Sequence, residues 1–263
     1  MFRPRPWVAL VVAALVLAWA GCMAPGPELE RELSAPRTCI TCTPNCGIVF
    51  VADGAGGFEG TSDRLREVVA EQRLPLQIET VDWTHGYLRA FADHMDFEHA
   101  VSEAKFLAGD IATLLRRERP PAIYLVAHSA GAGVILPTVQ YLPPNSIERV
   151  ILLAPAVSAD YDIRPALRCA RGGVEVFYSD RDRFILGFGT SVFGTTDRRR
   201  DSPAAGRVGF RTPVLSPEEQ GLLSRLHHHP WDPSMIYAGN RGGHYGSYEP
   251  EFLRAYILPL LLH

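Results

Sequence analysis

The chain has 263 residues, 47% of which are hydrophobic, and its formal net charge is −3 at pH 7. This length and apolar content are enough for one large domain with a well-buried core. The near-neutral charge gives no electrostatic reason to expect nucleic acid as a partner.

The first residues have the pattern of an export signal. Arg3 and Arg5 precede an apolar stretch over residues 7–20. A bilayer-spanning helix needs about 20 residues, so this shorter stretch is typical of the apolar region of a signal peptide. We expect residues 1–21 to be a signal peptide that exports the protein.

The cleavage region resembles a bacterial lipobox. The tetrapeptide WAGC at residues 19–22 places a cysteine directly after two small residues. In that pattern Cys22 is lipidated and becomes the mature N-terminus. Trp19 stands where an aliphatic residue is usual, and ordinary signal peptidase cutting after Ala20 is the alternative. We favour a lipoprotein anchored in a membrane of the cell envelope, on the periplasmic or outer-membrane face.

Residues 22–46 are expected to join this anchor to the fold as a tether with prolines and charges that ends in a cysteine-rich segment. Apart from Cys22 the chain has four cysteines, which are Cys39, Cys42, Cys46 and Cys169. An even number in an oxidising compartment predicts two disulfides, and three pairings are open. The competing interpretation of CITCTPNC is a metal or cluster site, although no fourth ligand lies nearby.

Apolar runs predict the strands, which begin at residue 47. The predicted strands are GIVFVA from residue 47, LQIETVDW at 76–83, AIYLVAHS at 122–129, RVILLAPAVS at 149–158 and VEVFYSD at 174–180, and SMIYAG at 234–239 is the candidate for a sixth. Runs such as AIYLVAHS are apolar on consecutive residues, as in strands that are buried on both faces.

Segments with helical spacing lie between the strands. Helices are predicted at residues 61–73, with Thr61 or Ser62 as cap, and at residues 97–117. A third helix begins at Ala130, and Pro137 kinks or ends it. A fourth is predicted at residues 249–262, with Pro250 in its first turn. The alternation predicts an α/β fold for residues 47–263, with a mostly parallel central sheet of about six strands and helices on both faces. Ligands bind such sheets at the carboxyl ends of the strands.

The segment AHSAG at residues 127–131 follows a predicted buried strand and precedes a helix. It has the form small-x-Ser-x-small, which a nucleophile elbow needs because its serine takes a strained backbone conformation between crowded neighbours. Ala127 stands at the commoner first glycine, and Gly131 keeps the second. Ser129 is the candidate nucleophile, although a serine after a strand is often only a turn residue.

A serine nucleophile needs a base, and the base needs an acid that orients it. In folds with this elbow the partners follow in the order serine, acid, histidine. YSDRDRF at residues 178–184 offers Asp180 and Asp182, and His244 lies in RGGHYGSY at 241–248. We favour Asp182 because the turn needs a few residues before the acid points back at the histidine, and Asp160 after the fourth strand is a third candidate.

An oxyanion hole needs main-chain N–H groups that face the developing negative charge. Ala130, directly after the serine, supplies one such group, and Gly54 or Ala55 in the loop DGAGGF supplies the second. With this glycine-rich loop, the serine elbow, the later acid and the late histidine, the chain resembles the α/β-hydrolase superfamily of serine hydrolases, which includes lipases, esterases and cutinases. The resemblance covers about residue 47 to the C-terminus.

The chain departs from that family in two places. Asp53 stands where the oxyanion loop of the family often has histidine, and its carboxylate would repel an oxyanion unless it points away, so we expect it to brace the loop. The first predicted strand leads directly to this loop, so the early antiparallel strands of the family are expected to be missing, as in the reduced sheet of cutinase-like members.

Several other residues have competing interpretations. His128 is expected to be structural, and the tract HHHP with His227 to His229 invites a zinc site, although consecutive histidines rarely converge on one metal. Trp83, His85 and Tyr87 are expected either to line the substrate cleft or to pack in the core or at its rim. The insertion between Asp182 and His244 is expected to form a rim or flap.

The resemblance implies hydrolysis of a carboxylic ester of a small molecule or lipid, without metal or cofactor. Amide and thioester bonds remain open because the same residues serve them. A non-catalytic envelope lipoprotein that uses the hydrolase scaffold for binding is the alternative from another class. The acyl-chain length and the oligomeric state are open.

Overall fold

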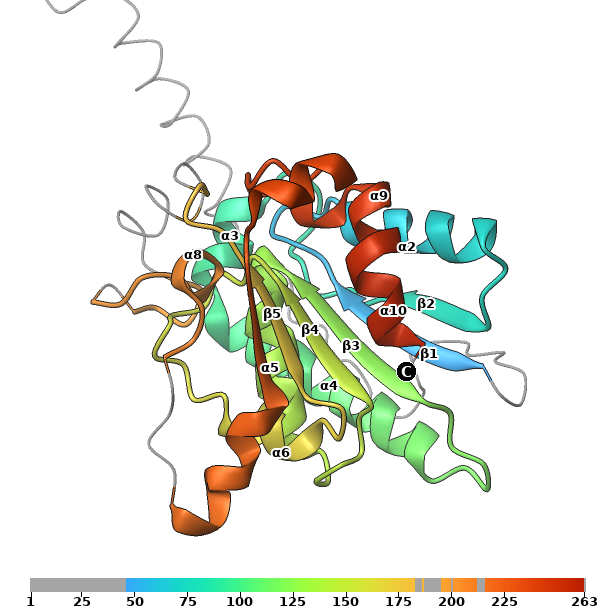
Figure 1. Ribbon diagram of the computed structural model, residues 1–263. Coiled ribbons are helices and arrows are strands. Elements are labelled where there is room, and N and C mark those ends of the chain that lie inside the picture. The colour runs from blue at the N-terminus through green and yellow to red at the C-terminus, as the bar shows by residue number, and fades with distance from the viewer. Residues whose placement is uncertain (1–45, 183–185, 187–194, 200, 212–215, 263) are drawn as a thin grey trace, which may run out of the picture. The chain divides into compact units, whose positions relative to one another are not determined.

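The computed structural model describes residues 46–182, 186, 195–199, 201–211 and 216–262 (Figure 1). The expected signal peptide and tether, including Cys22, Cys39 and Cys42, lie outside the described residues. No helix among the described residues is long and apolar enough to cross a membrane.

A six-stranded sheet of parallel strands forms the centre of the fold, in the order β2-β1-β3-β4-β5-β6. The strands are β1 (Gly47–Ala52), β2 (Leu76–Thr80), β3 (Ile123–His128), β4 (Arg149–Leu153), β5 (Val174–Tyr178) and β6 (Leu226–Pro230). The α/β fold class predicted from the sequence is confirmed. Within the described residues no antiparallel strand belongs to this sheet.

Apolar side chains cover the sheet on both faces. In β1, Ile48 and Phe50 point into one core cluster, whereas Val49 and Val51 point into another. The first cluster is closed by α4 (Phe97–Leu115), α5 (Ala132–Thr138) and α6 (Arg164–Cys169). The second is closed by α2 (Gly60–Glu71) and the C-terminal helical stretch of α9 (Pro250–Phe252), η7 (Leu253–Ile257) and α10 (Leu258–Leu261). Burial on both faces explains why the inner strands are apolar throughout.

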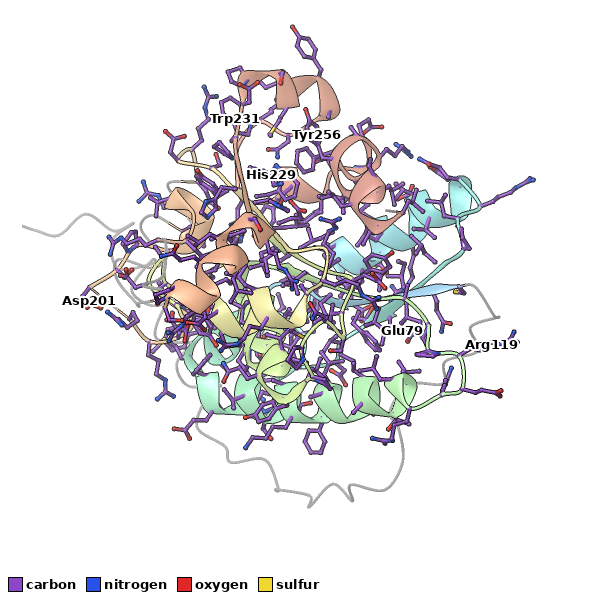
Figure 2. All side chains as sticks on the ribbon, turned by 60° about the horizontal axis from the view of Figure 1, so that its bottom comes forward. Glu79, Arg119, Asp201, His229, Trp231 and Tyr256 are labelled. Carbon is purple, nitrogen blue, oxygen red and sulfur yellow. The ribbon has the colours of Figure 1, made fainter. Side chains whose placement is uncertain are left out.

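The sixth strand lies at Leu226–Pro230, so the candidate at residues 234–239 is wrong. That segment is part of a 3-10 helix, η5 (Pro233–Ala238), which Asp232 caps by accepting a hydrogen bond from the main-chain N–H of Ser234. The real strand has a polar sequence because it lies at the edge of the sheet. Trp231, directly after β6, and Tyr256 of the C-terminal helices both pack against the second core cluster, and both are labelled with His229 in Figure 2.

Several short helices were not predicted. They are α3 (Ala90–Met95), α6, α8 (Ala205–Val208), η2 (Val139–Tyr141), η4 (Pro217–Arg225) and η6 (Gly246–Tyr248), and η1 (Ser129–Gly131) opens the predicted helix at Ala130. α5 ends at Thr138, directly after Pro137, as the sequence predicts. The start of α2 differs, because neither Thr61 nor Ser62 caps the helix through its side chain.

Cys169 is a free cysteine that lies buried at the end of α6, so the prediction that all four cysteines pair is wrong. Its Sγ lies 3.5 Å from Ser146 Oγ, and burial raises the pKa of the thiol. Counting cysteines fails here because a buried thiol also packs as a small apolar side chain. Any pairing among Cys39, Cys42 and Cys46 stays a prediction.

Candidate active site

Ser129 follows the last residue of β3 at the carboxyl edge of the sheet and begins η1. Its φ is +52°, in the left-handed region that non-glycine residues rarely adopt. Two neighbours hold this turn, since Ala156 donates its main-chain N–H to the main-chain oxygen of Ser129 at 3.0 Å and Ala127 pairs with Ala52 of β1. The strained turn lifts the hydroxyl out of the sheet.

Gly131 has to be small because the chain passes directly over the end of β1. A Cβ at this position would lie 2.1 Å from the main-chain oxygen of Ala52 and 2.7 Å from that of Asp53. No side chain fits at these distances. The small residue two positions after Ser129 is therefore a packing requirement of the elbow.

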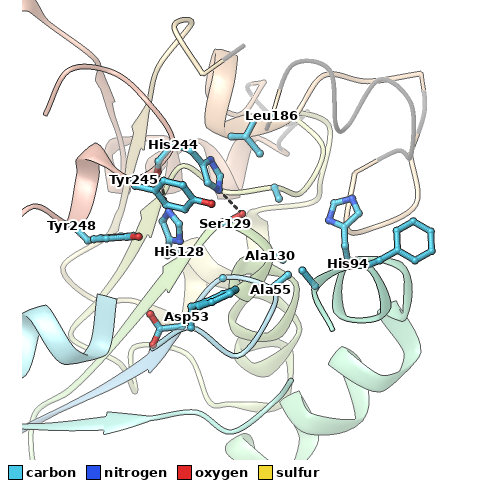
Figure 3. Close-up of a pocket in the computed structure, with 15 residues that line it drawn as sticks. Asp53, Ala55, His94, His128, Ser129, Ala130, Leu186, His244, Tyr245 and Tyr248 are labelled. Atoms are coloured by element: carbon cyan, nitrogen blue, oxygen red, sulfur yellow. Dashed lines mark hydrogen bonds between the residues drawn. The ribbon is translucent and has the colours of Figure 1, made fainter. Parts of the chain in front are cut away.

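Ser129, His244 and Asp182 form one hydrogen-bonded chain, of which Figure 3 shows the link between Ser129 and His244. Ser129 Oγ lies 2.9 Å from His244 Nε2, and His244 Nδ1 lies 2.5 Å from Asp182 Oδ2. Because a carboxylate only accepts hydrogen bonds, Nδ1 carries the proton and Nε2 accepts the hydroxyl of Ser129. All three side chains are buried, although they come from three loops distant in the sequence. This is the geometry of an activated serine.

The structure distinguishes among the three candidate acids. Asp182 is 4% exposed and its second oxygen accepts the main-chain N–H of Leu186 at 3.3 Å, which fixes the carboxylate. Asp180 is exposed. Asp160 lies in an ion pair with Arg211 at 2.7 Å and its contacts do not include His244. Of these carboxylates, the structure brings Asp182 to the histidine.

The loop after β1 lies beside Ser129, and both Gly54 and Ala55 line the same cavity as Ala130. The N–H of Gly56, next in the chain, is bound to the carboxylate of Asp93 at 2.7 Å. In the part of the chain that the structure describes, no main-chain hydrogen bond uses the N–H of Gly54 or Ala55. Both residues thus lie where an oxyanion donor is needed, beside Ser129 in the lining of the cavity.

The carboxylate of Asp53 points away from Ser129 (Figure 3). It accepts the main-chain N–H of Thr61 at 2.7 Å, and the N–H and hydroxyl of Ser62 at 3.3 and 2.6 Å. It thus caps α2 from outside the helix by accepting N–H groups that the first turn leaves unpaired. Burial raises the pKa of Asp53, and these hydrogen bonds oppose the rise.

A cavity of about 560 Å³ opens above the serine. Its lining is mostly apolar and comprises Ala55, Phe58, Ala90, Phe91, Ala130, Ala156 and Leu186, together with Asp53, Gly54, His94, His128, Ser129, His244, Tyr245 and Tyr248. Leu186 comes from the insertion expected to form a rim, of which residues 183–185, 187–194, 200 and 212–215 lie outside the described residues. An apolar cavity over one reactive hydroxyl suits the apolar part of a substrate.

The aromatic residues after β2 do not line the cavity. Trp83 is buried in the core and donates its Nε1–H to the main-chain oxygen of Asp53 at 3.0 Å. His85 Nδ1 lies 2.9 Å from Asp93, and Tyr87 is exposed and packs edge-on against Phe58. Of the two open interpretations, packing in the core or at the rim describes them.

The three histidines of β6 point to opposite faces of the sheet. His227 and His229 both contact the buried carboxylate of Glu175, at 2.9 and 2.6 Å, and Glu175 also pairs with Arg149. His228 accepts the main-chain N–H of Phe210 at 3.1 Å instead. No group of three metal-ligating side chains suited to a metal occurs among the described residues.

Sequence reasoning missed part of this site. Phe91 and His94 reach the cavity from α3, and Asp93 of the same helix binds the loop at Gly56. Tyr245 and Tyr248 line the opposite side (Figure 3). Tyr245 had a usable signal, because it directly follows the candidate base in the sequence.

No protein-family model and no curated protein matches the chain. Among solved structures, it is similar to a cutinase-like protein from Cryptococcus sp., with 12% identity over 84% of this chain and 97% of that one and a TM-score of 0.43. It is also similar to the catalytic core domain of acetyl xylan esterase from Trichoderma reesei, with 12% identity, coverage of 83% and 98% and a TM-score of 0.45. For Est1E from Butyrivibrio proteoclasticus the identity is 14%, the coverage 84% and 90% and the TM-score 0.45.

Proposed function

We propose that the protein is a serine hydrolase that cleaves carboxylic esters through an acyl-enzyme. Ser129 is the nucleophile, His244 the general base and Asp182 the acid that orients the base. One observation carries the proposal, namely the unbroken hydrogen-bond chain from Asp182 through His244 to Ser129 beside an apolar cavity.

The geometry supports a two-step reaction. Ser129 Oγ attacks the ester carbonyl carbon while His244 Nε2 takes the hydroxyl proton, and Asp182 stabilises the imidazolium that forms. His244 then gives this proton to the departing alkoxide, which leaves as an alcohol. A water molecule attacks the acyl-enzyme, His244 takes one of its protons, and the carboxylic acid is released as Ser129 recovers its proton.

The negative charge on the carbonyl oxygen has two sets of donors within reach. Ala130 lies directly after the nucleophile, and Gly54 and Ala55 lie in the loop that lines the same cavity. Main-chain N–H groups that are already fixed stabilise such an oxyanion without reorganisation, which in other hydrolases is worth about 3–4 kcal/mol per donor. Since Asp53 turns its carboxylate toward α2, it does not occupy this position.

A fluorophosphonate probe tests the proposal directly, because it reacts with activated serines and not with ordinary ones. We expect stoichiometric labelling at Ser129, with hydrolysis of short p-nitrophenyl esters by the same preparation. Parallel assays with matched amide and thioester substrates decide which bond is preferred. A folded protein that is not labelled and cleaves none of the three would instead be a non-catalytic binding protein.

The proposal includes export and anchoring of the enzyme at the cell envelope through a lipid on Cys22. The apolar stretch over residues 7–20 and the WAGC pattern support this location. The substrate would then be an ester that reaches the envelope, of a small molecule or a lipid.

A further inference from the structure

His128 connects the loop of the candidate base to the end of β3. It is the last residue of that strand, directly before Ser129, and is 3% exposed. Its Nε2 lies 3.0 Å from the main-chain oxygen of His244. Because a carbonyl oxygen only accepts hydrogen bonds, Nε2 of His128 carries the proton and donates it.

The imidazole of His128 is neutral. Burial, together with a smaller effect of the nearby His244, lowers its pKa to about 3. With Nε2 protonated in a neutral ring, Nδ1 has no proton. Because its pKa is so low, the ring of His128 is too weak a base to take the proton of the nucleophile.

The other side of the ring faces the loop after β1. A Cβ at Gly54 would lie 3.1 Å from His128 Nδ1, so the imidazole fills the space beside that residue. The ring centroid lies 4.8 Å from that of His244 and 5.0 Å from that of Tyr248 (Figure 3). One neutral ring thus contacts both the loop of the base and the loop of the candidate oxyanion donors.

We infer that His128 is a positioning residue, whose Nε2–H holds the main-chain oxygen of His244 and thereby fixes the base over Ser129. The inference rests on the proposed function, because it assigns His128 a task in that reaction. Loss of this hydrogen bond frees the loop of His244 without removing any reacting group. A displacement of about 1 Å in such a site can cost about 100-fold in rate.

Three substitutions separate the hydrogen bond from the volume of the ring. In His128→Gln the side-chain amide nitrogen can replace Nε2, in His128→Asn it is too short, and His128→Leu has no donor. We expect kcat for a p-nitrophenyl ester to fall about 10- to 100-fold in the Asn and Leu variants, with KM within about threefold of wild type. The Gln variant should recover to within about fivefold of wild-type kcat, a rescue that packing alone does not explain.

His227→Leu is the matched control, because His227 also lies 2.9 Å from a main-chain oxygen, that of Ser224, but in β6 and outside the cavity. It should keep wild-type kcat. Equal losses in the Gln and Leu variants, or a Leu variant with wild-type kcat, overturn the inference. If the wild-type enzyme itself has no activity, the proposed function fails instead.

Nitrogen-15 NMR of the wild-type protein tests His128 without any activity and without any variant that has to fold. We expect its ring to show the neutral Nε2–H tautomer from neutral pH down to about pH 5. A protonated Nδ1 or a ring that titrates in that range overturns the inference. The signal is assigned by its absence in His128→Gln.

Discussion

The main-chain N–H of Gly56 donates a hydrogen bond of 2.7 Å to the carboxylate of Asp93, which lies 37 residues further along the chain. Asp93 is fully buried and also accepts the main-chain N–H of His85 at 2.6 Å. The same short helix, α3, carries Phe91 and His94 into the cavity. The candidate oxyanion loop and one wall of the cavity are therefore held together by a single carboxylate.

Replacing Asp93 by alanine should therefore lower both stability and activity. It leaves the buried N–H of Gly56 and the partly buried N–H of His85 unpaired, which should reduce the free energy of unfolding by about 2–4 kcal/mol. We expect kcat/KM to fall about 10- to 100-fold because the oxyanion loop loses its brace. Denaturant unfolding and ester kinetics measure the two effects.

Asp96→Ala is the control for this prediction. Asp96 caps α4 by accepting the main-chain N–H of His99 at 3.0 Å and does not line the cavity. Its loss should cost about 1 kcal/mol of stability and leave kcat/KM unchanged. Equal effects of both substitutions on activity would show that Asp93 acts through stability alone.

Ser129→Ala should abolish hydrolysis of p-nitrophenyl esters and labelling by a fluorophosphonate. The fold should survive, because the small alanine side chain fits the same elbow. The hydrogen bond that is lost joins Ser129 to His244 within the site. Circular dichroism and thermal melting check the fold alongside the assay. Activity within a few-fold of wild type in this variant would exclude Ser129 as the nucleophile.

Asp182→Asn should reduce kcat far more than Asp180→Asn, by as much as about 10,000-fold. An asparagine in place of Asp182 can present its NH₂ group to His244 and so favour the wrong tautomer of the imidazole. Asp180 is exposed, and Asp160 pairs with Arg211, so the corresponding substitutions should be nearly silent. The reverse ranking in single-turnover kinetics would move the acid to Asp180. If Asp182→Asn and Asp180→Asn were both silent, the result would favour Asp160.

Gly131→Ala should destabilise the protein by about 2 kcal/mol or more, because the new Cβ would meet main-chain atoms of Ala52 and Asp53. Gly109→Ala is the matched control. Gly109 is exposed in α4 and a Cβ there meets nothing within 4 Å, so alanine should stabilise the helix by about 1 kcal/mol. If both variants unfold at the wild-type denaturant concentration, the close approach at the elbow is not a constraint.

Cys22→Ala should release the protein from membranes in cell fractionation. The WAGC pattern predicts that Cys22 carries the lipid, so the wild-type mature chain should show a diacyl or triacyl adduct by intact mass. The buried thiol of Cys169 should react with thiol reagents only after unfolding. A soluble mature chain that begins at Gly21 without an adduct would refute the anchor and leave the hydrolase proposal intact.

The inner strands could be predicted because each is apolar on consecutive residues, as β1, β3 and β4 show. β6 could not, since an edge strand needs few apolar side chains and its histidines bind Glu175 instead. The apolar residues of SMIYAG resemble a strand, but Asp232 and Pro233 before them are the cap and first-turn signals of the 3-10 helix that forms there.

For the candidate site, the chain order of serine, acid and histidine could be predicted because Ser129 follows β3 and Asp182 follows β5. His244 follows η5 instead of the predicted strand. The sequence predicted a bracing role for Asp53, but not its partners Thr61 and Ser62. The bracing role of Asp93 depends on main-chain donors, which have no sequence signature. The cavity walls supplied by α3 depend on how a helix of six residues packs, and local periodicity does not report that.

The edge of the sheet at β6 bears on the behaviour of this protein at high concentration. A flat apolar edge strand is a template on which a strand from another molecule can add. β6 instead reads Leu-His-His-His-Pro, and Pro230 at its end has no N–H to offer to an incoming strand. We therefore expect a strand from another molecule to pair poorly with this edge of the sheet.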